Sequence, residues 1–112
     1  MEEVIVYCVN DGAVMQAWGE NQKIANTYVT FVADPFGDLT RGLDVLMDHP
    51  GPAEVGIINR CKRNVIVFKN GVAKYVAVAE GDGDPAGDAK PDVTLAEAVL
   101  ETLTSTKTVR EL

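Results

Sequence analysis

Cys61 is the residue whose sequence neighbours most favour chemistry. It follows Arg60 and precedes Lys62 and Arg63, and positive neighbours favour the thiolate form of a cysteine, which is its nucleophilic form. This run predicts a reactive thiol at Cys61, and the alternative interpretation is a partly buried, inert cysteine. Arg60 and Lys62 themselves are expected to be solvated.

Cys8 stands in a different setting, within the apolar run of residues 4–9. Apolar surroundings raise the pKa of a thiol, so Cys8 is predicted to be a core cysteine. Two cysteines without paired-ligand spacing predict neither a disulfide framework nor a zinc site, and a reducing compartment is the default for such a chain. His49 has no second histidine with which to form a metal pair, so no metal or cofactor is predicted.

The acidic segment 82–88 partly imitates a calcium-binding loop. Asp82 and Asp84 occupy the first and third positions, and Gly87 occupies the sixth. However, Ala86 and Val93 stand at the fifth and twelfth positions, where such a loop needs oxygen ligands. A solvated turn is therefore predicted.

Length and composition restrict the class of protein. The chain has 112 residues with 46% hydrophobic content, which fits one small domain over residues 1–112. Its net charge of −7, from 17 acidic and 10 basic residues, argues against nucleic acid or an anionic membrane as the main partner. No apolar run approaches the roughly 18 residues of a membrane span, and the start Met-Glu-Glu does not resemble a basic signal peptide. Localisation stays open, with a reducing intracellular compartment as the default.

The elements that must position these side chains alternate between strand and helix. Residues 4–9 are β-branched and apolar, which is typical of a strand covered on both faces in a parallel sheet. Asn10 or Asp11 is expected to cap the following helix, and residues 28–33 are predicted to form a second apolar strand. The apolar positions of that helix are Val14, Ala17, Trp18 and Ile24.

A second helix is predicted to begin at the pair Asp34-Pro35, as an N-cap followed by proline at the first helical position. The sequence His-Pro-Gly-Pro at residues 49–52 is expected to end it. Gly37 and Gly42 weaken this helix by about 1 kcal/mol each. Its apolar stripe is Phe36, Leu39, Leu43, Leu46 and Met47.

The clearest local signal is a β-hairpin. Residues 64–69 and 72–80 flank the pair Asn70-Gly71, which favours a type I′ turn. Residues 81–91 are predicted to form a loop, and Thr94 with Glu97 predicts a capping box for a final helix. The stripe of that helix is Leu95, Val99 and Leu103. The order of elements indicates an α/β fold with mixed strand directions.

Four sequence blocks follow one another between about residues 4 and 103. They are Val9-Asn10-Asp11 with the string AVMQAWG at residues 13–19, VADPFG at residues 32–37, the acidic and apolar residues 42–48, and Asn59-Arg60-Cys61-Lys62-Arg63 before the hairpin. In this order and at this spacing they resemble the atypical two-cysteine (type II) peroxiredoxins. The resemblance implies a thioredoxin-like fold, a mixed sheet flanked by helices.

The resemblance also indicates which functional residues of the family occur in this sequence and which do not. The family's peroxidatic motif, Pro-x-x-x-Thr-x-x-Cys, lies upstream of the block that begins near Val4, and no such motif occurs in the 112 residues. Arg63 matches the family's active-site arginine, which stabilises the thiolate and the peroxide, and the alternative is an ordinary arginine at the start of a strand. Cys8 lies two residues from a redox cysteine that some relatives carry. We therefore expect a truncated C-terminal portion of the domain, without the N-terminal strands and the peroxidatic helix.

Two functions follow from this expectation. The first is a non-catalytic, degenerate module with a binding or structural role. The second is a thiol-dependent peroxidase that uses Cys61 with Arg63 or that a partner chain completes. A third interpretation is that the chain is a truncated product without an independent role.

The missing segment also bears on partners. In the family's sheet, one strand lies between the strand that matches residues 4–9 and the first hairpin strand. Its absence is expected to leave open backbone groups that invite another strand. The hairpin could move into its place, but we expect pairing with another chain, as a homo-oligomer, as a subunit of a larger assembly, or with a strand-donating partner.

Overall fold

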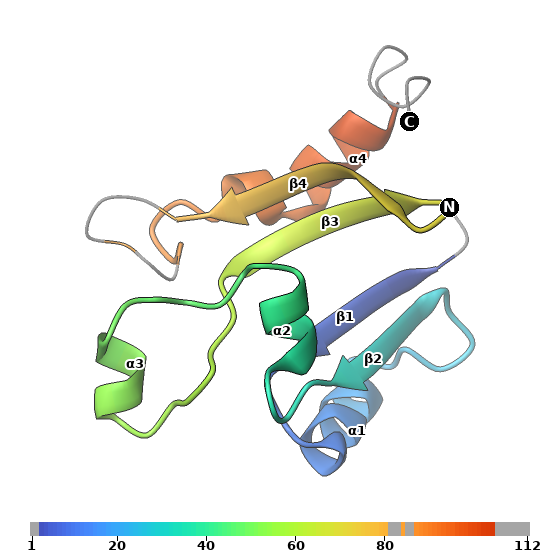
Figure 1. Cartoon of the computed structure of the whole chain (residues 1–112). Helices are drawn as coiled ribbons and strands as arrows, with labels where there is room; N and C mark the ends of the chain where they lie inside the picture. Colours follow the sequence, from blue (N-terminus) through green and yellow to red (C-terminus); the bar gives the residue numbers. More distant parts are fainter. Residues whose placement is uncertain (1–2, 81–83, 85–86, 105–112) are drawn as a thin grey trace. The chain divides into compact units, whose positions relative to one another are not determined.

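The structure is a computed structural model that describes residues 3–80, 84 and 87–104. It divides into two compact units, Met1–Cys61 and Lys62–Leu112. The first unit holds β1 (Val4–Cys8), α1 (Gly12–Asn21), β2 (Val29–Ala33), α2 (Asp38–Gly42) and α3 (Gly51–Glu54). The second holds β3 (Arg63–Lys69), β4 (Val72–Ala79), the short 3₁₀ helix η1 (Asp92–Thr94) and α4 (Ala96–Thr104) (Figure 1). The expectation of one domain over residues 1–112 stays a prediction.

The first unit begins with the predicted strand, helix and strand. β1 and β2 pair in parallel, in register from Val4 opposite Val29 to Cys8 opposite Ala33. Of the two candidate caps of α1, the N-cap is Asp11, whose side chain accepts a hydrogen bond of 2.9 Å from the backbone N–H of Val14. These three elements confirm the predicted order.

Helix α1 packs on β2 through the residues of one helical face. The rings of Trp18 and Phe31 lie 4.5 Å apart between centroids and are tilted by 45°, which is a favourable geometry for an aromatic pair. Met15 is 3% exposed on the same side of the helix. This contact is what attaches the helix to the parallel strand pair.

The prediction of a long second helix from Asp34 is wrong. Gly37, not Asp34, occupies the N-cap position of α2, and its φ of 73° is left-handed, which interrupts a helix that would start at Pro35. Helix α2 ends at Gly42, after which Asp44 also has a positive φ of 58°. A separate short helix, α3, forms where the Pro-Gly-Pro sequence was expected only to end the earlier one.

The hairpin of the second unit is confirmed. β3 and β4 pair antiparallel, and Asn70 and Gly71 both have positive φ angles of 53° and 79°, as a type I′ turn requires. The register shifts by one residue between Val67 and Phe68, because Val67 lies opposite Tyr75 and Phe68 lies opposite Ala73. This β-bulge leaves Lys74 without an opposite residue in β3.

The predicted capping box at Thr94 is wrong. The Thr94 hydroxyl donates to the carbonyl of Pro91 at 2.8 Å, within η1. Helix α4 instead begins after Leu95, which has an extended backbone and whose carbonyl accepts from the N–H of Val99 at 3.1 Å. Because the 3₁₀ turn uses the threonine hydroxyl locally, the helix starts later than the capping box predicts.

The buried core is small. Among the described residues, Met15, Val45, Ala77 and Ala79 are the buried hydrophobic side chains. The expectation that both faces of the first strand are covered is wrong at its beginning, since Val4 is 37% and Ile5 58% exposed. No helix in the described ranges is long and apolar enough to cross a membrane. Many large apolar side chains lie at the surface, including Tyr28, Phe36, Val55, Ile58, Val76 and Leu100.

Candidate functional site

Cys8 ends strand β1 and is partly buried. Its carbonyl oxygen accepts from the backbone N–H of Asp34 at 2.9 Å, which continues the ladder to β2. Burial raises the pKa of the Cys8 thiol, and the neighbouring Cys61 raises it further. The direction of this shift agrees with the interpretation of Cys8 as a core cysteine.

Cys61 is also a free, partly buried cysteine of the first unit. It forms an isolated antiparallel bridge with Leu46, beside a 2.8 Å hydrogen bond from the N–H of Met47 to the carbonyl of Arg60. Cys61 therefore lies in extended chain that is tied to the segment after α2. Its reactivity stays a prediction.

Neither thiol lies at the start of a helix. A helix N-terminus stabilises a thiolate through its free N–H groups and its dipole. In the first unit these positions hold Asp11 at α1, Gly37 at α2 and Pro50 at α3. The described helices of this unit therefore give neither cysteine that source of thiolate stabilisation.

Arg63 is the first residue of β3, opposite Ala79 of β4. Its Nη2 atom donates to Oδ1 of Asp88 at 2.8 Å, and the two side chains are 42% and 68% exposed. Lys62 was expected to be solvated, but its Nζ lies 3.4 Å from Oε2 of Glu80 and its side chain is only 21% exposed. Lys62 and Arg63 are thus each paired with an acidic residue that follows β4.

The acidic segment folds into a turn in its described residues. Asp84 accepts from the N–H of Asp88 at 3.1 Å and from the N–H of Ala89 at 3.0 Å, and its own carbonyl accepts from Gly87. The Asp84 carboxylate is therefore used as a backbone cap. Asp82 and Ala86, which belong to the imitation of a calcium loop, lie outside the described residues.

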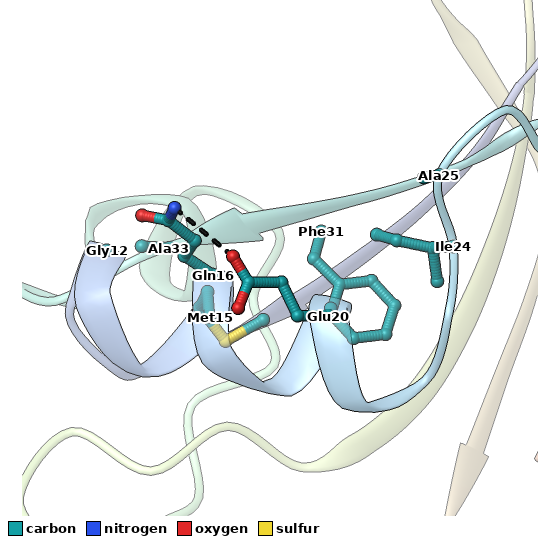
Figure 2. A pocket seen from close by; sticks show the side chains of 9 residues that line it. Gly12, Met15, Gln16, Glu20, Ile24, Ala25, Phe31 and Ala33 are labelled. Carbon is teal, nitrogen blue, oxygen red and sulfur yellow. Dashed lines mark hydrogen bonds between the residues drawn. The ribbon is translucent and has the colours of Figure 1, made fainter.

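A mainly apolar groove of about 380 Å³ lies along α1 and β2 in the first unit (Figure 2). Gln16 and Glu20 stand beside it, joined by a hydrogen bond of 3.5 Å. The sequence reasoning missed this groove, although the glycines at positions 12 and 19 of one helical face were the available signal. The lining residues are Gly12, Met15, Gln16, Gly19, Glu20, Ile24, Ala25, Phe31 and Ala33.

Comparison with known proteins identifies the relatives of this chain. No family model matches it. The hybrid peroxiredoxin hyPrx5 of Haemophilus influenzae is 33% identical over 86 residues, which are 76% of this chain and 34% of that protein. A peroxiredoxin of Rhizobium etli is 32% identical over 100 residues, 88% of this chain and 53% of the relative. Over most of its length, the chain is homologous to peroxiredoxins.

The peroxiredoxin fold is supported by solved structures. Reduced Prx3 from Vibrio vulnificus superposes with a TM-score of 0.72 at 26% identity, over 94% of this chain and 59% of that one. The same protein crystallised with hydrogen peroxide gives a TM-score of 0.71 at 29% identity, over 92% of this chain and 56% of that one. The predicted family and thioredoxin-like fold are thus confirmed. The chain spans only about a third to a half of the two curated peroxiredoxins, which fits the predicted C-terminal portion.

Proposed function

We propose that this 112-residue peroxiredoxin homologue by itself is a binding or structural module and does not act as a peroxidase. The observation that carries the proposal is the placement of its thiols. Cys8 ends a strand and Cys61 lies in an isolated bridge, so neither has a helix N-terminus to stabilise a thiolate. Burial of Cys8 shifts its pKa upward, away from the reactive form at neutral pH.

The direct test of this proposal is a peroxide-consumption assay with a thiol reductant. The purified chain is compared with Cys61→Ser and Cys8→Ser, with a folded thiol protein of no peroxidase activity as the baseline. We expect the wild type to stay at the baseline rate. Rapid, reductant-coupled turnover that Cys61→Ser abolishes would overturn the proposal.

The binding role has support from the edge of β1. The sheet of the first unit contains only β1 and β2 among the described residues, and a two-stranded parallel pair is weakly stable without further cover. The Val4 N–H and the Cys8 carbonyl both bond toward β2. Because backbone direction alternates along a strand, the N–H and C=O of Ile5 point away from β2. We propose that a strand of a second chain pairs along this edge, so the protein is a homo-oligomer or a subunit of an assembly.

Proline substitutions separate the two edges of β1. Ile5→Pro removes an N–H that points away from β2, whereas Val6→Pro removes one that points toward β2. We expect the wild type to have a multimeric mass by light scattering, and Ile5→Pro to lower that mass while the circular dichroism spectrum is kept. Val6→Pro is the matched control and should reduce folding itself. A monomeric, cooperatively unfolding wild type would exclude self-association at this edge.

The second candidate function is a thiol-dependent peroxidase that uses Cys61 with Arg63 or that a partner chain completes. Its support is the match of Arg63 to the family's anion-stabilising arginine, on the ordered start of a strand. The Vibrio relative, which was crystallised with hydrogen peroxide, is similar over most of this chain. The same assay distinguishes the variants of this function. Turnover that is lost in Arg63→Gln and Cys61→Ser favours a peroxidase that uses Cys61 with Arg63. Turnover that appears only after a partner chain is added favours a peroxidase that the partner completes.

A further inference from the structure

Arg63 and Asp88 are 25 residues apart in the sequence, and three hydrogen bonds shape the turn that presents Asp88 to the arginine. Residues Asp84, Gly87, Asp88 and Ala89, named here the Asp84 turn, are held by the Asp84 side chain and carbonyl. Each bond satisfies a backbone N–H of the turn. The position of the Asp88 side chain is therefore set by Asp84.

Gly87 fixes this turn against the hairpin. Its φ is 71°, and a Cβ atom built on it would lie 2.7 Å from the carbonyl carbon and 2.8 Å from the Cβ of Ala79. Real Cβ atoms do not approach backbone so closely, so only glycine allows this contact. Ala79 is buried and is the register partner of Arg63 in the sheet. The turn is thus seated on strand β4 directly across from the arginine.

As a result, the guanidinium of Arg63 already binds a carboxylate of its own chain, that of Asp88. Asp88 follows Gly87, and its Oδ1 accepts from Nη2 of Arg63 at 2.8 Å. A guanidinium binds carboxylates, phosphates and other anions through the same N–H donors. An anionic ligand that approaches this donor meets Asp88 already in place.

We infer that the Asp84 turn is a latch on Arg63, in which Asp88 is an internal anion that an external oxyanion must displace from the Nη2 donor. The inference rests on the proposed anion-binding role of Arg63. It adds that access to this arginine is regulated by a segment more than twenty residues away in the sequence. No titration or bond formation is involved, only an exchange of one anion for another.

The strength of the latch follows from its exposure. Ion pairs between exposed side chains stabilise by a small amount, so the displacement of Asp88 costs an external anion a factor of about 1.4 to 5 in affinity. A latch of this strength weakens anion binding without preventing it. It therefore adjusts the concentration at which Arg63 takes a ligand.

The test measures modification of Arg63 by phenylglyoxal, an arginine-selective reagent, with inorganic phosphate as the competing anion. Modification is followed by peptide mass spectrometry, and Arg41, which has its own ion pair with Asp38, is the internal reference. Asp88→Asn removes the charge and keeps the shape. Gly87→Ala keeps every charge and displaces the turn. Asp92→Asn, at an exposed acidic residue of η1, controls for net charge.

We expect the phosphate concentration that halves Arg63 modification to fall by about 1.4- to 5-fold in both Asp88→Asn and Gly87→Ala. Asp92→Asn should behave as the wild type. An Asp88→Asn variant that matches Asp92→Asn would overturn the latch, and so would absence of phosphate protection in every variant. If circular dichroism shows that Gly87→Ala does not fold, the comparison of Asp88→Asn with Asp92→Asn decides whether the latch exists. Because no peroxide is used, the result is independent of the peroxidase assay.

Discussion

Replacement of Asp34 by asparagine should destabilise the first unit more than any other single change of charge there. Asp34 is 6% exposed, and its Oδ2 accepts from the Thr40 N–H at 2.9 Å and from the Thr40 hydroxyl at 2.8 Å. Its Oδ1 accepts from the Leu39 N–H at 3.1 Å. An asparagine amide has only one acceptor atom, so in either orientation an NH₂ group faces a backbone N–H.

The magnitude follows from these contacts. Hydrogen bonds to a charged acceptor contribute about 1.5 to 3 kcal/mol, and a buried donor left without an acceptor costs about 1 to 3 kcal/mol. Since asparagine keeps part of the network, we expect Asp34→Asn to lower the free energy of unfolding by about 2 to 4 kcal/mol at pH 7. Asp38→Asn, at an exposed acid of α2, is the matched control and should cost less than about 1 kcal/mol.

The same network predicts a dependence on pH. Burial of Asp34 opposes its ionisation, but hydrogen bonds from Thr40, Leu39 and Asp38 outweigh burial and lower the pKa of the carboxyl below 3.8. A lowered folded pKa contributes stability that is complete above the unfolded value of about 3.9 and is lost as the pH falls through the folded value. The difference in the free energy of unfolding between wild type and Asp34→Asn should therefore be constant from pH 7 to about 5 and should decrease at lower pH.

Urea denaturation followed by Trp18 fluorescence is the suitable assay, because Trp18 is the one tryptophan and stacks on Phe31 in the same unit as Asp34. Midpoints are measured at several pH values for the wild type, Asp34→Asn and Asp38→Asn. The reasoning is refuted if Asp34→Asn is as stable as Asp38→Asn at pH 7. It is also refuted if the difference in stability between wild type and Asp34→Asn does not decrease below about pH 4.

Three further predictions concern local structure. Asp11→Ala should lower the stability of the first unit by about 1 kcal/mol in thermal or urea unfolding, because the cap bond to Val14 is lost, and an unchanged midpoint would contradict that role. Gly71→Ala should cost about 1 to 2 kcal/mol, since its φ is 79° while its Cβ would meet no atom within 4 Å, so a larger loss would indicate a clash that the structure does not show. In a Cys61→Ser background, the pH midpoint for alkylation of Cys8 by iodoacetamide should lie above the ordinary thiol value of 9.0 in the folded protein and return to it in urea, and equal midpoints would show that burial has no effect.

Local signals in the sequence were sufficient to predict several of the secondary-structure elements. The Asn70-Gly71 pair identified the hairpin because two adjacent positive φ angles are required there, and asparagine and glycine adopt them readily. The pair Asn10-Asp11 identified the start of α1, because the side chain of either residue can satisfy a free N–H two or three residues on, and in the structure Asp11 does so. The family resemblance gave the fold, which the similarity to solved peroxiredoxins confirmed.

Competition between neighbouring groups explains the errors. The Asp34 carboxylate does accept hydrogen bonds from backbone N–H groups of α2, but it does so across a turn that the left-handed Gly37 forms, so the helix begins three residues later than the Asp-Pro pair predicts. Thr94 uses its hydroxyl within η1 instead of at the start of α4. In both cases the sequence contains the right polar residue, and only the backbone path decides which N–H or carbonyl it bonds.

The site was harder to predict because its ion pairs join distant residues. Arg63 was selected by resemblance, yet nothing in the sequence indicated that Asp88 would be its partner. That pairing depends on the register of the hairpin and on the seating of Gly87 on Ala79. The basic character of the run around Cys61 was likewise visible, whereas the Lys62–Glu80 pair was not.

The bulge in β4 has a consequence for unwanted aggregation. Lys74 has no opposite residue there, and the irregular, more strongly twisted backbone next to Lys69 and Lys74 is a poor template for a further chain. Fibril-like stacking on the β4 side would have to flatten this kink and bring lysines of successive copies together. Open-ended polymerisation in that direction is therefore disfavoured, so chains that associate through their other sheet can stop at a finite number of copies.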